Sequence, residues 1–276
     1  MILAAGFLLY DLKLGSGDSI YVHTVESTTT RIEKFSSSGT HLQTFTITNG
    51  TADGQAASLE TYIPNSDGSL YIVDFHTDRI QKLKADGSFD SKITWARHEA
   101  TSFIENFFQN PDGSFVLVEK DTDVVIHKID STGATIWKKD GTETGTAFNA
   151  GLNPSLAKFD NKYYFTQQNV LHIYSETGGL LNSFTKVMTS PSAVVRASDG
   201  SFFVGDANGI IKYSASGIQQ NSFASPITMR TMAISPNDVI YSVNKMLSGP
   251  NRIPGLYKSR NLSLRQNNNR GLLRAF

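Results

Sequence analysis

Short segments with apolar residues at both ends recur along this chain, separated by turns rich in glycine, asparagine and aspartate. One such segment is Ile80-Gln-Lys-Leu83, and the more apolar Leu70-Tyr-Ile-Val73 precedes it. Segments of this length that are rich in β-branched and aromatic residues predict strands. Because no long window has the 3.6-residue periodicity of a helix, the pattern predicts an all-β fold.

A turn with a fixed spacing recurs through the whole chain. An apolar residue is followed four positions later by glycine at Phe35–Gly39, Leu83–Gly87, Ile129–Gly133, Tyr174–Gly178 and Tyr213–Gly217. A sixth copy, Tyr257–Asn261, has asparagine, which also tolerates positive φ. The intervals between these turn residues are 48, 46, 45, 39 and 44, a period typical of repeat architectures.

Each repeat reads as strand, turn, strand, loop, strand, glycine turn and strand, which is a four-stranded antiparallel meander. A single meander cannot bury both of its faces, so the repeats must stack, and a closed ring leaves only short edges. Six copies therefore predict a six-bladed β-propeller of four-stranded antiparallel blades. We expect one propeller domain at 1–266 and a basic tail at 267–276.

The second repeat, Asp67 to Gly87, resembles an NHL-type propeller repeat. It has an Asp-Gly turn, a strand that ends in Asp74, an Arg79-Ile80 pair after a short loop, and the final turn glycine. The wider set of NHL, SBBP and gluconolactonase-like propellers is similar over nearly the whole chain. That resemblance implies the architecture, and its members include binding modules, bacterial surface proteins, lyases and metal-dependent lactonases, so the fold does not select a function.

Composition narrows the chemistry. There is no cysteine, which excludes thiol catalysis, cysteine-based zinc sites and disulfides. The 18% of charged residues and the many Ser, Thr, Asn and Gly are typical of an extracellular or cell-surface protein. Met1–Tyr10 is apolar but lacks a basic region, so this chain shows no signal peptide, and no run reaches the roughly 20 apolar residues of a membrane helix.

Charge is uneven although it sums to zero. Residues 239–276 contain seven of the 25 Lys and Arg residues and no acid, so 18 basic and 25 acidic residues remain elsewhere, a net charge of −7. Seven charges interrupted by apolar residues argue against nucleic acid as a partner. The tail at 267–276 is expected to be either flexible or bound to another chain, which makes homo-oligomer formation through this tail one hypothesis.

The innermost strands offer a general binding site, because loops of every blade converge at the centre of a propeller. One residue of each repeat lies six or seven positions before the first turn. These predicted binding residues are Tyr10, Thr61, Asn106, Asn153, Ser192 and Arg230. A slip of one residue would turn a strand side chain to the other face.

No catalytic residue and no metal site is predicted as the leading interpretation. The six histidines are not expected to share one site, and they show no HxH or HExxH spacing. The alternative rests on the lactonase-like propellers, which bind a divalent cation through Glu, Asn and Asp oxygens. That resemblance would assign Ca or Zn to Glu105, Asn106, Asn153 and Asp206.

We therefore expect a non-catalytic recognition propeller whose partner is a protein or carbohydrate surface. The first alternative is a metal-dependent hydrolase or lyase with a divalent cation at the central channel. The second alternative is a structural subunit of a surface assembly, docked through its tail. A bound cation, or carboxylates that meet at the axis, would favour the enzyme.

Overall fold

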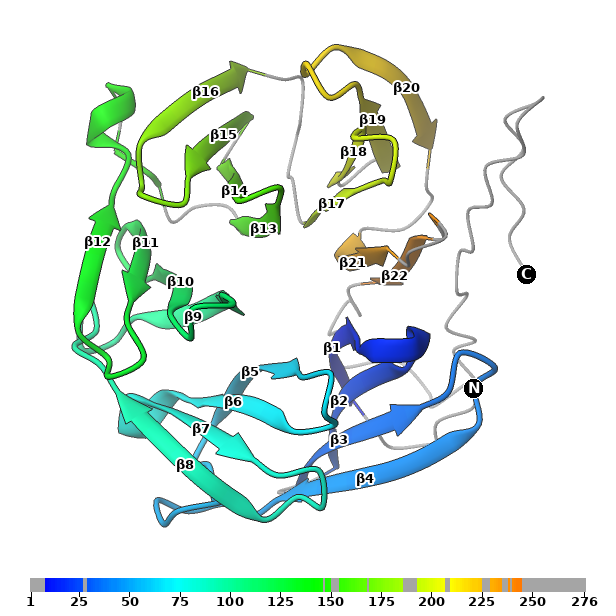
Figure 1. Cartoon of the computed structure of the whole chain (residues 1–276), viewed down its shortest axis with the longest axis vertical. Helices are drawn as coiled ribbons and strands as arrows, with labels where there is room; N and C mark the ends of the chain where they lie inside the picture. The colour runs from blue at the N-terminus through cyan, green and yellow to red at the C-terminus, as the bar shows by residue number, and fades with distance from the viewer. Residues whose placement is uncertain are drawn as a thin grey trace, which may run out of the picture.

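The computed structural model describes residues 8–26, 29–145, 147–149, 154–167, 169–185, 193–206, 209–224, 229–234, 238 and 240–244, and the structural statements below concern these residues. They form antiparallel sheets arranged radially in a ring (Figure 1). The described residues contain three 3₁₀ turns, at Ser16–Asp18, Phe75–Thr77 and Thr142–Thr144. Among the described residues, no helix is long and apolar enough to cross a membrane.

Five sheets have four strands each. The first contains β1 (Leu8–Leu14), β2 (Ile20–Glu26), β3 (Thr29–Phe35) and β4 (His41–Ile47). The second contains β5 (Leu59–Pro64), β6 (Leu70–Asp74), β7 (Arg79–Leu83) and β8 (Phe89–Thr94). The third contains β9 (Phe103–Gln109), β10 (Phe115–Lys120), β11 (Val124–Ile129) and β12 (Thr135–Lys139).

The fourth contains β13 (Ser155–Phe159), β14 (Lys162–Gln167), β15 (Val170–Ser175) and β16 (Leu180–Thr185). The fifth contains β17 (Ala193–Arg196), β18 (Phe202–Asp206), β19 (Gly209–Tyr213) and β20 (Gln219–Ala224). In each sheet the strands follow one another in chain order, as the meander pattern predicts. The all-β propeller with four-stranded antiparallel blades is thus confirmed.

The predicted number of blades is wrong, because the structure has five four-stranded blades rather than six. The sixth repeat contributes a two-stranded sheet, β21 (Met229–Ile234) paired with β22 (Ile240–Asn244). In sequence this repeat departs from the others after β22, where Gly249-Pro250 and Pro254-Gly255 precede Tyr257. Proline donates no ladder hydrogen bond and disfavours a central strand, so a repeat period by itself does not guarantee four strands in every repeat. The predicted boundary at 266/267 lies outside the described residues.

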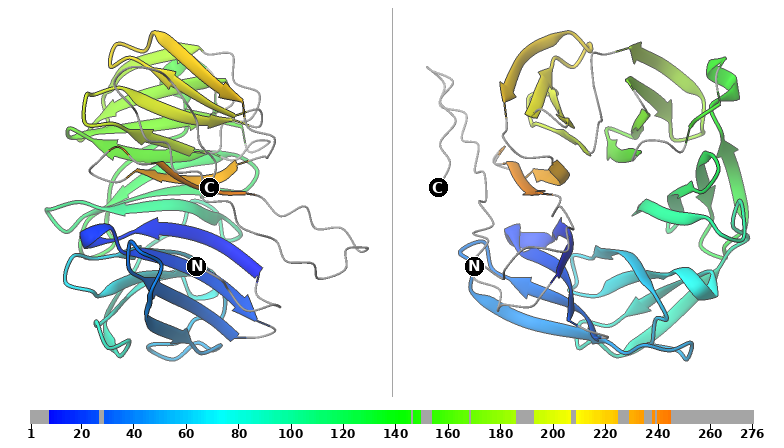
Figure 2. Two further views of the ribbon diagram at one scale, coloured as in Figure 1. Left: turned by 90° about the vertical axis from the view of Figure 1, so that its right-hand side faces the viewer. Right: turned by 180° about the vertical axis from the view of Figure 1, so that it is seen from behind.

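The innermost strands contact one another around the ring in the order β1, β5, β9, β13, β17 and β21, and β21 contacts β1 in turn. Figure 2 shows the same closure from behind, with the β21–β22 sheet between the first and fifth blades. Both ends of the described chain therefore meet at one place in the ring.

The core lies between neighbouring blades, because each sheet has two faces to cover. One cluster joins Tyr21 and Phe45 of the first blade to Tyr62 and Leu70 of the second, all nearly fully buried. The Tyr62 hydroxyl donates a 2.8 Å hydrogen bond to the Tyr21 carbonyl oxygen. Similar clusters fill the other junctions, so repeated aromatic residues hold the blades at a fixed distance.

The predicted turn glycines adopt the left-handed backbone. The φ angles of Gly39, Gly87, Gly133, Gly178 and Gly217 lie between 81° and 94°. In each turn the glycine N–H donates to a carbonyl three residues earlier, as from Gly87 to Lys84 at 2.9 Å. The prediction that these positions need positive φ is confirmed for all five repeats.

Candidate functional site

Four innermost strands carry a β-bulge at the same place. The register with the second strand skips one residue in β1, β5, β9 and β21. The skipped residues are Tyr10, Glu60, Glu105 and Arg230. A bulge leaves its extra residue outside the ladder and changes the direction of its side chain, and such bulges are common beside binding sites.

The bulges decide where the predicted binding residues lie. Tyr10 and Arg230 are themselves bulged residues. Thr61 and Asn106 each come one position after the bulge. Asn153 and Ser192 lie outside the described residues.

Thr61 and Asn106 occupy positions between the blades. The Thr61 side chain is buried, and Asn106 Nδ2 donates a 3.1 Å hydrogen bond to the Leu156 carbonyl oxygen of β13. In these two strands the bulged residues are Glu60 and Glu105. Sequence reasoning missed Glu60, because a bulge is invisible in an alternation pattern and shifts the face by one residue.

Glu60 links two innermost strands. Its Oε1 atom accepts a 3.1 Å hydrogen bond from the backbone N–H of Ile104 in β9. Its Oε2 atom accepts no hydrogen bond among the described residues and lies 3.9 Å from Nη2 of Arg97. The side chain is only 7% exposed, so the second oxygen has capacity for a ligand or a proton.

The surroundings of Glu60 raise the pKa of its carboxyl group toward neutral pH. Burial raises the pKa of Glu60 to about 7, and the neighbouring Glu105 and Asp74 carboxylates act in the same direction. Arg97 and the Ile104 N–H oppose this rise in pKa. A carboxyl group with a pKa near 7 can either donate or accept a hydrogen bond, and it can transfer a proton.

Arg97 is held rigidly in the connection between β8 and β9. Its Nη2 donates to the Phe75 carbonyl oxygen at 2.6 Å, and its Nη1 donates to the Ser102 carbonyl oxygen. Its Nε forms an ion pair with Asp78. The guanidinium carbon lies 4.8 Å from the Phe75 ring centroid, so contacts on several sides fix its orientation toward Glu60.

An aromatic pair lies beside this site. Phe75 directly follows β6, and Phe103 is the first residue of β9. The rings of Phe75 and Phe103 are stacked, with centroids 4.7 Å apart and an interplanar angle of 9°. Phe103 is 54% exposed. Two positions further along β9, Glu105 forms a 3.5 Å ion pair with Lys120. We refer to Glu60, Phe75, Arg97, Phe103 and Glu105 as the β5–β9 site.

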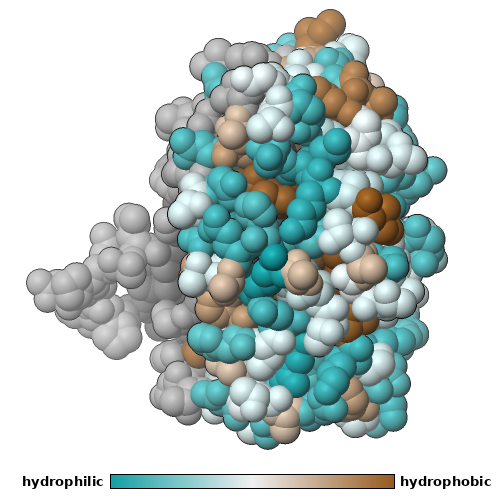
Figure 3. All heavy atoms as spheres, turned by 90° about the vertical axis from the view of Figure 1, so that its left-hand side faces the viewer, coloured by the Kyte–Doolittle hydropathy of each residue, from teal (hydrophilic) through white to brown (hydrophobic). Residues whose placement is uncertain are grey.

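The outer wall of the ring has fewer features of a binding site than the β5–β9 site has. Exposed aliphatic side chains there include Leu42, Ile136, Leu181 and Ile218, each on or beside a different outermost strand. Figure 3 shows one side of the wall, where apolar residues are separated by polar ones. Singly exposed apolar residues are ordinary on a soluble protein.

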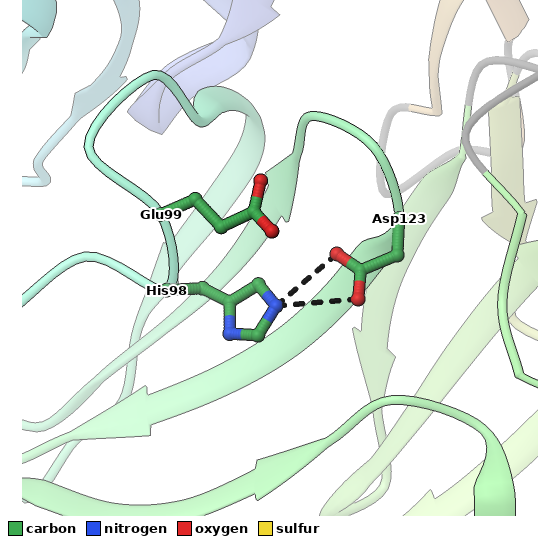
Figure 4. A group of neighbouring side chains, drawn as sticks. All are labelled: His98, Glu99 and Asp123. Atoms are coloured by element: carbon green, nitrogen blue, oxygen red, sulfur yellow. Dashed lines mark hydrogen bonds and ion pairs between the residues drawn. The ribbon is translucent and has the colours of Figure 1, made fainter.

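The alternative metal set is not brought together in the described residues. Glu105 pairs with Lys120 and Asn106 binds Leu156, while Asp206 ends β18 and Asn153 lies outside the described residues. The side chains in the described residues that do converge as metal ligands are His98, Glu99 and Asp123 (Figure 4). They come from two loops, so no spacing within one element identifies them.

No family model and no curated protein matches the sequence. Solved structures show the fold. A streptogramin B lyase has a TM-score of 0.64 at 16% identity, with 87% of this chain and 79% of that chain covered. A luciferin-regenerating enzyme has a TM-score of 0.60 at 13% identity, with 88% and 85% covered.

The WD40 propeller domain of Doa1 has a TM-score of 0.60 at 12% identity, with 86% of this chain and 75% of that chain covered. At these identities the similarity concerns the fold alone. The chain is a β-propeller, and both enzymes and a WD40 propeller domain share its architecture.

Proposed function

We propose that this protein is a recognition propeller that binds a carbohydrate at the β5–β9 site. The observation that carries the proposal is the exposed Phe103 ring, stacked on Phe75 beside the buried Glu60–Arg97 pair. An aromatic face offers contact area for the apolar face of a sugar ring. Carboxyl and guanidinium groups placed nearby would hydrogen-bond the hydroxyl groups and give specificity.

Two further features support a binding role. Arg97 is oriented before any ligand arrives, since its contacts are to the protein's own backbone and rings, which lowers the entropy cost of binding. A composition poor in charge is consistent with glycan recognition on or outside the cell.

The experiment is a glycan-array screen with the whole chain, followed by titration of the strongest glycan. Phe103→Ala should weaken binding at least tenfold, because it removes the exposed ring. Leu181→Ala is the matched control, since Leu181 is 53% exposed on the outer strand β16, and it should bind normally. Absence of glycan binding, or equal loss in both variants, would refute the proposal.

The same assay separates the hydrolase or lyase alternative. That alternative is favoured by one observation, the pKa of about 7 at Glu60 beside a second carboxylate, Glu105, which suits an acid–base residue. If the bound glycan is chemically changed over time, and Glu60→Gln abolishes the change while retaining binding, the protein is an enzyme. An unchanged glycan after prolonged incubation supports recognition without catalysis.

A further inference from the structure

We propose that His98, Glu99 and Asp123 form a binding site for one divalent transition-metal ion such as Zn²⁺. These residues differ from those of the β5–β9 site, although His98 directly follows Arg97, and the proposal does not depend on the function proposed there. His98 and Glu99 belong to the connection between β8 and β9, and Asp123 ends the turn between β10 and β11. Figure 4 shows the imidazole and both carboxylates directed toward one space between these two loops.

The distance between His98 and Asp123 fits metal coordination, and Glu99 lies close enough to join them. One ligand atom from each of the three residues lies within 4.8 Å of the others. His98 Nε2 is 3.1 Å from Asp123 Oδ1 and 3.3 Å from Oδ2. Ligand atoms about 2.0–2.2 Å from a metal ion lie roughly 3.0–3.5 Å from each other, so this pair already has the separation of two ligands.

The loops hold the ligands before any ion binds. The backbone N–H of His98 donates a 2.6 Å hydrogen bond to Glu119 Oε2. Glu119 is in turn held by His127, whose Nδ1 lies 2.6 Å from Oε1, and both side chains are fully buried. On the other side, the backbone N–H of Glu99 donates to the Ser102 hydroxyl at 3.1 Å, and such outer contacts orient metal ligands.

The Asp123 carboxylate already faces the imidazole of His98. His98 Nε2 forms a 3.3 Å hydrogen bond with Oδ2 and lies 3.1 Å from Oδ1, and Oδ1 is buried with no other partner among the described residues. An ion between the two groups would satisfy the imidazole and the carboxylate together.

The donor set selects the class of ion. One imidazole nitrogen and two carboxylates suit Zn²⁺ or a similar transition ion, whereas Ca²⁺ takes six to eight oxygen ligands. The His98 and Asp123 side chains are 29% and 37% exposed, so an ion can enter from solvent. Three protein ligands leave a coordination position for water.

The test is isothermal titration of the metal-stripped whole chain with Zn²⁺ at pH 7.5. We expect one saturable site, with at least a tenfold loss of affinity in His98→Ala and in Asp123→Asn. Thermal melting of the metal-free variants checks that each one folds, and Glu99→Gln offers a third variant.

The matched control is His41→Ala. His41 also pairs with a carboxylate, its Nε2 lying 2.8 Å from Glu33 Oε2, but it lies in the first blade and belongs to no group of three such ligands among the described residues. This variant should bind Zn²⁺ as the unmodified chain does. The proposal is overturned if no saturable binding occurs, if His98→Ala binds normally, or if His41→Ala loses as much affinity.

Discussion

Replacing Glu60 with glutamine should change how the stability of the protein depends on pH. The folded protein raises the pKa of Glu60 from 4.5 to about 7, chiefly by burial. Between these values the unfolded chain has lost its proton while the folded chain still holds one, so the free energy of unfolding falls as pH rises. Each pKa unit corresponds to about 1.4 kcal/mol, so the loss reaches about 3 kcal/mol above pH 7.

Glutamine removes this penalty and keeps most of the geometry. Its side-chain oxygen can still accept the hydrogen bond that Glu60 receives from the Ile104 N–H. Arg97 loses an ionic partner at 3.9 Å but retains its contacts to Phe75 and Asp78. We therefore expect Glu60→Gln to be more stable than the unmodified protein by about 1–3 kcal/mol at pH 8, with the difference vanishing near pH 4.5.

The assay is urea unfolding of both proteins at several pH values from 2.5 to 8, comparing the difference between them. Asp86→Asn provides a control of opposite sign. The Ser88 hydroxyl and amide lower the pKa of Asp86, so this carboxylate contributes stability at neutral pH that is lost as pH falls through its folded pKa. A difference between Glu60→Gln and the unmodified protein that does not change with pH would show that Glu60 is not buried as an acid.

Two further predictions concern turns and the buried pair. A Cβ atom at Gly133 would lie 1.8 Å from the Thr94 carbonyl oxygen, whereas at Gly87 its nearest neighbour is 3.6 Å away. Gly87→Ala should therefore lower the free energy of unfolding by about 1–2 kcal/mol through backbone strain alone. Gly133→Ala should lower it further, and equal melting temperatures of the two variants would contradict this expectation. His127→Ala leaves the Glu119 carboxylate buried without its 2.6 Å partner and should cost about 3–5 kcal/mol in chemical denaturation, while a loss below 1 kcal/mol would mean that the pair is not buried as described.

The repeated features of the chain were predictable because they are local. Alternating apolar residues predict strands wherever they occur, and a turn that needs positive φ accepts glycine in any blade, as Gly87 and Gly217 show. The period of the turns then gives a ring of stacked meanders.

Contacts between residues that are distant in sequence determined the features that the repeat pattern did not predict. A bulge in β5 made Glu60, rather than Thr61, the residue outside the ladder, and its pKa depends on burial and on Arg97, which is 37 positions away in sequence. His98 and Asp123 meet because two loops fold over one blade. The period of the turns gives the number of repeats but not the number of paired strands in each repeat. In the sixth repeat the described residues form a two-stranded sheet. Side-chain direction, burial and charge are set by neighbours that are distant in sequence, and a pattern along the chain does not contain them.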